Sequence, residues 1–461
     1  MTAKRPNFRR TTATALLLLS SCLAGQAMAE TLQGALAKAY ASNPTLTGAR
    51  AGQRATDENV PLQKANGRPA ADVSGSYSES ILKPTISFTA PQRTVNAQAQ
   101  LNVPIYSGGT VRNGVKAAKT RVAAGQANLR GTEASVFSQT VAAYMDVIRD
   151  SAIVALNQAN VKVLDVNLQA TNDRFEVGDL TRTDVAQSES RLALARSDLQ
   201  IAQSNLITSR ENYIALVGEA PDNLEPPPQL PGLPANPETA VQVALRDNAD
   251  ILAAQKQREA RHYDAKAAKG GVLPRVSAFT QAGYTNYLHS LDSTALDANG
   301  NAVEGPQINK QAVAGVQLTI PLYQGGRPAA QVRQTQALES QAIEQEIEIE
   351  RGVIAQTRAA YASWQASLQT IDSNQKAVEA ASLSLEGVRA ENSVGSRTIL
   401  DILNAEQEAL NARVQLVSAR RNAYVAGFSL LAAMGHAEAD DLGLASGTLY
   451  DPMVNYDRVK G

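Results

Sequence analysis

The chain has 461 residues, a formal net charge of −1, one cysteine and only 4% aromatic residues. A charge this close to zero, without a basic stripe, gives no support for nucleic acid as a partner. So few aromatic residues disfavour a series of compact cores and fit long helices packed at narrow seams. Beyond the first 29 residues no segment reaches 18 uncharged apolar residues, so no transmembrane helix is predicted.

The first 29 residues are expected to be a secretory signal peptide. A basic start is followed by the apolar run Ala13–Leu19 and by the small-residue cleavage site Ala27-Met28-Ala29. A bacterial lipobox is the alternative, because LSSC would place a lipid on Cys22. Cleavage before Glu30 is favoured, since the apolar run continues past Cys22 to the second site. The mature chain would then lack cysteine, which suits an exported protein without disulfides.

The rest of the chain is an internal duplication. The phrase PIYSGG at Pro104–Gly109 returns as PLYQGG at Pro321–Gly326, a numbering offset of 217. The same offset relates Gly178 to Gly395, whereas before the phrase the offset is 205. The larger offset predicts an insertion of residues in the second half before Pro321, and the polar and turn-rich stretch LDSTALDANGNAVEGP is the expected place for it.

This duplication divides the chain into five segments. They are a signal peptide (1–29), a first repeat (30–224), a proline-rich linker (225–237), a second repeat (238–435) and a C-terminal tail (436–461). Closely spaced prolines exclude helix from the linker and favour an extended connector. Each repeat is expected to contain a helical stretch, two strands, a very long helix and, after a glycine break, a returning helix.

The strands are predicted from alternating polar and apolar residues. The alternation runs from Thr94 to Ile105 and is repeated from Ala312 to Ile320, with 72–79 and 275–287 as the expected partner strands. It fits a soluble, half-buried sheet as well as a transmembrane barrel with lipid outside and water inside. In a barrel, the polar residues of the first alternation would face the lumen: Asn96, Gln98, Gln100 and Asn102.

The repeated phrase has a structural meaning at the end of each predicted strand. Pro104 and Pro321 cannot donate to a sheet ladder and are expected to end their strands. The glycine pairs that follow, at 108–109 and 325–326, allow a sharp turn into the next helix. The glycines concerned are Gly108, Gly109, Gly325 and Gly326. A structural role is favoured over a binding role for this motif.

Residues 112–175 contain no proline and carry apolar residues at seven-residue spacing, with one four-residue step. This is a coiled-coil seam with a stutter, and a helix of this length runs roughly 100 Å. A coiled-coil spacer would explain such helices but not the hairpins attached to them. Four strands are too few to close a barrel, and open edges cannot exist in lipid. Strands that cross a membrane would therefore require several copies in one closed wall.

The chain resembles the TolC-like outer-membrane efflux proteins over nearly its whole mature length. The resemblance is carried by the opening ETLQGALAKAYASNP, by the two strand-end phrases, and by the turns FEVGDLTRTDV and NSVGSRTILDIL. It implies a mainly α fold with transmembrane β structure. In it, a long coiled-coil α-helical barrel is joined to the 12-stranded β-barrel of a trimer, with four strands from each protomer.

The resemblance also implies a function, a location and partners. The protein would be a passive exit duct in the outer membrane of a Gram-negative bacterium, embedded in lipid and extending into the periplasm. It would serve efflux or type I secretion together with a periplasmic adaptor and an inner-membrane efflux or ABC transporter. Two readings from other classes stay open, namely a periplasmic coiled-coil adaptor or spacer and a free-standing porin. Neither needs two matched glycine turns.

The same resemblance implies a gate at the periplasmic tip. The family's gating arginine falls on Arg397, its Thr-Asp partners fall on Thr183 and Asp184, and its constricting acidic ring falls on Asp401. Contact of Arg397 with the Thr-Asp pair is expected to favour the closed tip. Asp401, brought close to its symmetry copies, is expected to give cation preference and to have a raised pKa.

Other tip positions depart from the family pattern or serve the turns. A second acidic ring of the type member falls on Asn404, and a locking tyrosine falls on Asn392, so this tip should be held more loosely and carry fewer negative charges. The residues expected to make the tip turns and dock the adaptor are Val177, Gly178, Val394 and Gly395. Helix capping by the two aspartates and a solvated Arg397 are the simpler readings of the gate residues.

No enzymatic chemistry is predicted. The three histidines, His262, His289 and His436, have no metal-ligand spacing between them. The chain contains no G-x-S-x-G, no P-loop and no dinucleotide-binding fingerprint. We therefore expect no cofactor and no metal site.

Overall fold

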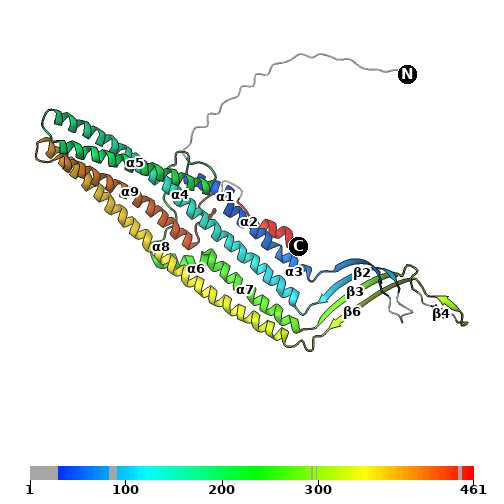
Figure 1. Ribbon diagram of the computed structural model, residues 1–461. Coiled ribbons are helices and arrows are strands. Elements are labelled where there is room, and N and C mark those ends of the chain that lie inside the picture. Colours follow the sequence, from blue (N-terminus) through cyan, green and yellow to red (C-terminus); the bar gives the residue numbers. More distant parts are fainter. Residues whose placement is uncertain (1–29, 83–90, 292–293, 297, 445–448) are drawn as a thin grey trace, which may run out of the picture.

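The computed structural model describes residues 30–461 apart from 83–90, 292–293, 297 and 445–448. The expected signal peptide, with Cys22 and its cleavage site, lies outside these residues. The molecule is long and narrow, with a bundle of helices along most of its length and a sheet at one end (Figure 1). The two helix-to-helix turns form the opposite end, which we call the tip.

The two halves of the chain have the same order of main elements. The first half contains α1 (Leu32–Ser42), α2 (Pro44–Asp57), α3 (Asn59–Ala65), β1 (Ala70–Glu79), β2 (Arg93–Tyr106), α4 (Thr110–Glu176) and α5 (Arg182–Val217). The second half contains α6 (Pro237–Asp247), α7 (Ala249–Lys269), the 3-10 turn η1 (Gly270–Val272), β3 (Arg275–Asn286), β4 (Thr294–Leu296), β5 (Ala302–Glu304), β6 (Ile308–Thr319), α8 (Arg327–Ser393) and α9 (Ile399–Met434). The small hairpin β4–β5 lies in the stretch where the sequence predicts an insertion. The expected tail contains a further helix, α10 (Pro452–Val459).

The main sheet is antiparallel, in the order β1-β2-β3-β6. The expectation that Pro104 ends its strand is wrong, because β2 continues to Tyr106. Pro104 pairs with Ser277, and the register shifts between Pro104 and Tyr106. A bulge at this point accommodates the missing N–H of the proline. In the second half, β6 ends at Thr319, before Pro321.

The corner between each strand and its long helix depends on glycine. Gly109 and Gly326 precede α4 and α8 with φ of +79° and +77°, in the left-handed region that glycine adopts without strain. A Cβ on Gly108 would lie 2.5 Å from the carbonyl oxygen of Gly270, and one on Gly270 would lie 2.4 Å from that of Gly108. The corner of the first half therefore meets the η1 turn of the second half backbone to backbone.

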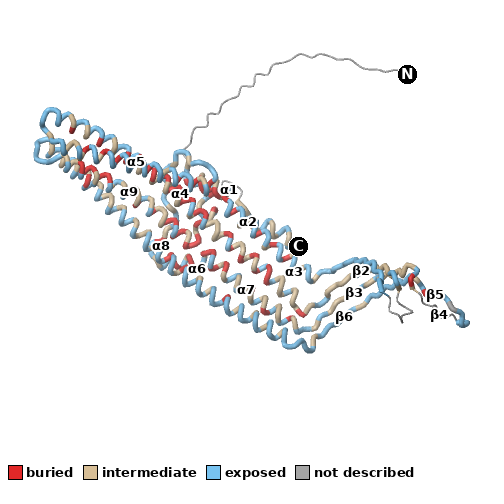
Figure 2. Tube along the Cα trace, in the orientation of Figure 1, coloured by how far each residue is buried: buried red, intermediate tan, exposed pale blue. Residues whose placement is uncertain are grey.

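The largest core lies in the middle of the molecule, where α1, α4, α5 and the end of α9 converge. Buried residues gather there, whereas the sheet and the tip are mostly exposed (Figure 2). Tyr144 is fully buried, and its hydroxyl donates to the carbonyl oxygens of Glu30 and Glu225, at 2.8 and 2.7 Å. Its counterpart Tyr361 donates to the carbonyl oxygen of Ala235 at 2.9 Å. Tyr144 thus ties the start of the first repeat to the start of the linker, and Tyr361 holds the end of the linker.

Within the described residues, every helix is either too short or too polar to span a membrane.

Candidate functional site: the helical tip

The turn between α4 and α5 is set by a left-handed glycine. Gly178 has φ +84° and donates its N–H to the carbonyl oxygen of Phe175 at 2.9 Å. The N–H of Asp179 donates to the carbonyl oxygen of Arg174, also at 2.9 Å. These two bonds make a Schellman motif, which ends α4 and satisfies its last carbonyls. The Arg174 guanidinium also donates to the Asp179 carboxylate at 2.7 Å.

The turn between α8 and α9 has the same construction. Gly395 has φ +81°, and its N–H donates to the carbonyl oxygen of Asn392 at 3.0 Å. The N–H of Ser396 donates to the carbonyl oxygen of Glu391 at 3.0 Å. A Cβ on Gly178 or Gly395 would meet nothing within 4 Å, so left-handed geometry, and not crowding, calls for glycine at both positions.

A valine precedes each of these glycines and lies in solvent. Val177 and Val394 are each 80% exposed, at the end of the molecule furthest from the sheet. Single exposed apolar side chains are common on protein surfaces, so docking of an adaptor at these turns stays a prediction. The two turns present their valines in the same local geometry.

The aspartates of the candidate gate cap the helices that leave the turns. The Asp184 carboxylate accepts from the N–H and the hydroxyl of Thr181, at 2.8 and 2.7 Å, and Asp401 accepts from Thr398 in the same way, at 2.9 and 2.8 Å. These hydrogen bonds stabilise the charged form and lower the pKa of both carboxyl groups. Within one chain the pKa of Asp401 is thus lowered. The rise expected in a ring of symmetry copies stays a prediction.

Arg397 pairs within its own turn. Its Nε donates to the Glu391 carboxylate at 2.7 Å, and its carbonyl oxygen accepts from the Asn392 amide at 2.7 Å. The structure does not bring Arg397 to Thr183 or Asp184 of the same chain. A contact of this kind stays a prediction for neighbouring copies.

Asn404 also has a partner within the chain. Its side-chain oxygen accepts from the guanidinium of Arg191, on α5, at 2.7 Å. The position at which the family's type member is expected to carry an acidic ring therefore carries a neutral amide next to an arginine. This bond links α5 to α9 close to the tip.

A buried glutamate between the two helical hairpins was missed by the sequence analysis. The side chain of Glu406, on α9, is only 4% exposed. Its two oxygens accept from the amide of Asn167, on α4, at 3.0 and 3.1 Å, and one of them accepts from Arg389, on α8, at 2.9 Å. We call these three residues the hairpin latch. A signal was available, because Glu406 lies at helical spacing between Leu403 and Leu410 in the apolar seam of α9.

The polar residues of β2 lie on one face of the sheet. Gln98 is opposite Ser74 of β1, and Gln100 is opposite Gln281 of β3. Asn96 accepts a hydrogen bond from the Thr285 hydroxyl at 2.9 Å. Asn102 differs from the others, because its neighbours across the sheet are Ala70 and Phe279. The polar face is therefore continuous at the outer end of the sheet and becomes apolar next to the helices.

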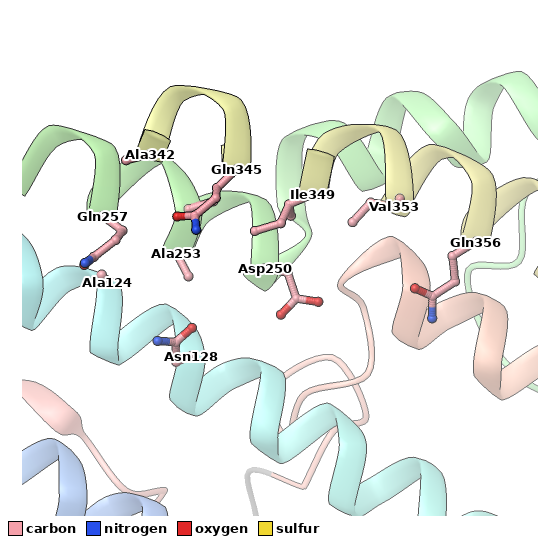
Figure 3. A pocket seen from close by; sticks show the side chains of 12 residues that line it. Ala124, Asn128, Asp250, Ala253, Gln257, Ala342, Gln345, Ile349, Val353 and Gln356 are labelled. Atoms are coloured by element: carbon pink, nitrogen blue, oxygen red, sulfur yellow. The ribbon is translucent and has the colours of Figure 1, made fainter. Parts of the chain in front are cut away.

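A pocket of about 450 Å³ lies between α4, α7 and α8 (Figure 3). Its polar groups come from the amides of Asn128, Gln257, Gln345 and Gln356, and from Asp250. Asp250 is the only titratable residue among the twelve that line it, so an acid–base pair is missing there. In the described part of the chain, no group of three His, Cys, Asp or Glu could hold a metal ion.

Comparisons with known proteins agree with this architecture. The sequence matches the outer membrane efflux protein family over residues 35–219 and 240–436, and the match is interrupted at the linker. It is 36% identical over 450 residues to the outer membrane efflux protein BepC of Brucella suis biovar 1 (strain 1330). The aligned region covers 97% of this chain and 94% of that protein. It is 27% identical over 319 residues to the outer membrane protein TolC of Escherichia coli (strain K12), covering 68% of this chain and 64% of that protein.

A solved structure has the same fold. The outer membrane channel CmeC of Campylobacter jejuni superposes on the chain with a TM-score of 0.75 at 16% identity, over 99% of this chain and 98% of that one.

Proposed function

The chain belongs to the outer membrane efflux protein family, and from this premise we propose how it assembles and how its tip works. It is an outer-membrane channel protein that extends into the periplasm and serves as an exit duct for efflux and type I secretion. The resemblance seen in the sequence is thereby confirmed. The duct is passive and has no catalytic step of its own, because an inner-membrane efflux or ABC transporter supplies the energy.

The open, two-faced sheet is the observation that carries the proposal. Strands β1 and β6 are its edges, and their outer backbone groups need partners in lipid. Three copies joined edge to edge would close a barrel of 12 strands, four from each chain. The apolar face, which includes the exposed Val73, Val316 and Leu318, would meet lipid. The opposite face would line the lumen with Asn96, Gln98, Gln100 and Asn102.

The tip is where this duct would be gated and docked. In the trimer, Arg397 of one copy would exchange Glu391 for Thr183 and Asp184 of a neighbouring copy, which would hold the closed state. Asp401 would form the narrowest ring. The exposed valine and glycine of each turn would dock a periplasmic adaptor.

Single-channel conductance of the membrane-extracted protein in planar bilayers tests the function. Small, long-lived and mostly closed conductances are expected of a duct with a gated tip. A large and permanently open conductance would favour a free-standing porin. If the protein gave no conductance and fractionated without membranes, the spacer reading would replace the duct.

The gate is tested by a matched pair of arginines. We expect Arg397→Ala to raise the single-channel conductance and the leakage of antibiotics, whereas Arg174→Ala leaves both unchanged. Each arginine makes one exposed ion pair within its own turn, worth only about 0–1 kcal/mol. The two variants therefore lose the same local contact and differ only in the proposed contact between copies. Equal behaviour of the variants would rule out Arg397 as the gating residue.

A further inference from the structure

Exposed lysine and arginine side chains gather where the helices meet the sheet. They belong to the first three turns of α4 and the last turn of α7, and they are Arg112, Lys116, Lys119, Lys266 and Lys269. The ring of Tyr263, also on α7, lies close to two of them. The Nζ atoms of Lys116 and Lys266 are 5.4 and 5.7 Å from the centre of this ring. We call these cations and the tyrosine the basic patch.

The positive charge of the basic patch is not balanced by carboxylates. Within the described residues, none of its cations forms an ion pair. Asp264, on α7, is already paired with Arg121 and Arg261. Glu339, on α8, contacts the imidazole of His262 at 2.7 Å. A concentration of unbalanced positive charge attracts an anionic partner.

The basic patch faces outwards from the helices that would surround the lumen of the trimer. Tyr456 of α10 packs against Ala118 and Val122 of α4. This second layer must lie outside the ring of helices, because inside it would obstruct the lumen. Arg112 and Lys119 lie at helical spacing from Val122, so they continue the same outer stripe of α4 towards the sheet.

A neighbouring copy would leave the basic patch uncovered. Helices α4 and α7 contact each other and lie between α3 and α8, which form the two sides of the bundle at this level (Figure 1). In the proposed function, on which this inference rests, copies are joined through those sides. The surface formed by α4 and α7 is therefore free for another partner.

The duplication shows that the fold does not require this charge. The elements that correspond to α4 and α7 are α8 and α3, and the residues that correspond to the basic patch follow from the two numbering offsets. Only two cations remain there, Arg333 and Lys64, and Glu58 takes the place of Tyr263. The charge is thus concentrated on one of two equivalent pairs of helices, which indicates a specific partner for that pair.

Apolar side chains border the basic patch on the side of the sheet. Val272 and Leu273 closely follow Lys269 and are 50% and 42% exposed. Ile105, near the end of β2, is 61% exposed. Positive charge beside exposed apolar surface fits a partner that has an anionic group at one end and hydrocarbon at the other.

The depth of the basic patch also fits a lipid headgroup. From Arg112 to Lys119 the axis of α4 rises by about 10 Å. The headgroup region of a bilayer extends roughly 5–8 Å beyond each side of the hydrocarbon core. A lysine further from the sheet can still reach this region, because its apolar stem lies along other apolar surface while its ammonium group extends to the headgroups.

We propose that the basic patch binds the phosphate groups of anionic phospholipids in the periplasmic leaflet of the outer membrane. Arg112 and Lys269 lie next to the sheet and contact the phosphates first. Lys116 and Lys266 flank Tyr263 and bind from the periplasmic side. Each trimer would carry three such sites, one on each chain.

Retention of lipid by the full-length trimer tests the proposal. Trimer is reconstituted in vesicles of equal parts phosphatidylglycerol and phosphatidylcholine and extracted again in detergent, and native mass spectrometry counts both lipids on the intact trimer. The patch variant carries Lys116→Gln with Lys266→Gln. The matched control carries Lys162→Gln with Arg210→Gln, which removes two exposed cations further along α4 and α5. A third variant, Lys116→Arg with Lys266→Arg, keeps the charge.

The readout is the ratio of the two lipids on the trimer. We expect the wild type to retain phosphatidylglycerol at least about fivefold over phosphatidylcholine, and the patch variant to lower this ratio by about threefold or more. The matched control and the arginine variant should keep the wild-type ratio. Added sodium chloride should lower the ratio in the wild type, because salt screens the attraction between exposed charges.

Four results would overturn the proposal. They are equal retention of both lipids by the wild type, an unchanged ratio in the patch variant, and loss of the preference in inorganic phosphate but not in chloride of the same ionic strength, which would indicate a site for free anions. The fourth is weaker binding of the patch variant to purified cell wall with an unchanged lipid ratio, which would assign the patch to an acidic polymer. A wild type that forms no trimer in vesicles would instead overturn the proposed function.

Discussion

The two longest helices have equal lengths but unequal surroundings. Helices α4 and α8 both contain 67 residues, yet buried residues recur along α4 from Ala117 to Thr171, whereas only four residues of α8 are buried. Helix α4 contacts helices of its own chain on both sides, whereas α8 runs along the edge of the molecule, where most of its length is exposed (Figure 2). The two helices hold the same place in their repeats. The difference therefore lies in the neighbours that each one has in a single chain.

The side chains of α8 fit a neighbour that one chain does not supply. Ile343 and Ile347 are 40% and 37% exposed, and their counterparts in α4 are Gln126 and Arg130. Arg130 pairs with Glu438, so α4 uses polar side chains to hold the C-terminal segment of its own chain. A second copy would cover these two exposed isoleucines in the proposed trimer.

The largest expected difference between the two repeats is the stability lost when the corresponding tyrosine of each is replaced by alanine. Tyr144 is fully buried, whereas Tyr361 is only partly buried. We expect Tyr144→Ala to lower the free energy of unfolding by about 3–5 kcal/mol, as for other large buried side chains, and Tyr361→Ala to lower it clearly less. Denaturant unfolding of the detergent-solubilised protein measures both. Equal losses would contradict the comparison within one chain and show that another copy buries Tyr361.

A smaller difference in stability is expected between the glycine corners of the two repeats, at Gly108 and Gly325. Gly108 and Gly325 have φ of +63° and +61°, so alanine brings the same backbone strain, about 1–2 kcal/mol, at both positions. Only at Gly108 would the new Cβ meet a backbone oxygen, that of Gly270. We expect Gly325→Ala to cost the strain alone and Gly108→Ala to cost more, measured as unfolding free energy. If both variants lose the same stability, a neighbouring chain must approach the corner at Gly325 equally closely.

Much of the fold could be predicted because its signals are local. Alternation over 94–105 predicted a strand that the structure places at 93–106, and heptads over 112–175 predicted a helix that spans 110–176. Pro104 was misjudged because its effect depends on the register with β3, which is a relation between distant segments. Helix α10 was missed, although Asp451 before Pro452 is a typical helix start, and the Asp451 side chain caps Met453 N–H.

The candidate site at the tip also has features that the local sequence predicts and features that depend on distant segments. The glycine turns and the capping role of Asp184 and Asp401 follow from residues that lie within a few positions of one another. The hairpin latch could not be predicted in full, because Asn167, Arg389 and Glu406 come from three helices and meet only in the packed structure. The contact between Arg397 and a neighbouring turn depends on an assembly that one chain does not contain.

The smallest expected difference between the repeats is the acid sensitivity of the contacts at the ends of α5 and α9. In the second repeat, Asp247 accepts from Arg246 and contacts the imidazole of His436, next to Gly435 at the end of α9. The corresponding residue of the first repeat is Ser42, which donates to the carbonyl oxygen of Val217. The contact made by Asp247 is thus ionic, whereas the contact made by Ser42 is neutral, although Lys38 pairs with Glu219 beside it. Of these two contacts, only the one made by Asp247 should respond to acid.

The direction of this response follows from the pKa of Asp247. The hydrogen bond from Arg246, helped by His436, lowers it to about 2, below the value of roughly 3.9 in an unfolded chain. The stabilisation is therefore complete above about pH 4 and is lost as the pH falls towards 2. Because Asp247 is solvent-accessible, this stabilisation should not exceed about 1 kcal/mol.

Substitution of the first-repeat residue into the second repeat isolates this contribution. Asp247→Ser should lower the melting temperature slightly at pH 6 and clearly less at pH 2, whereas Ser42→Ala should shift it by the same amount at both pH values. Differential scanning calorimetry against the wild type gives these differences directly, because the acid sensitivity of all other groups is shared. A pH-independent effect of Asp247→Ser would mean that the geometry of the helix end, and not the charge of Asp247, distinguishes the two repeats at this contact.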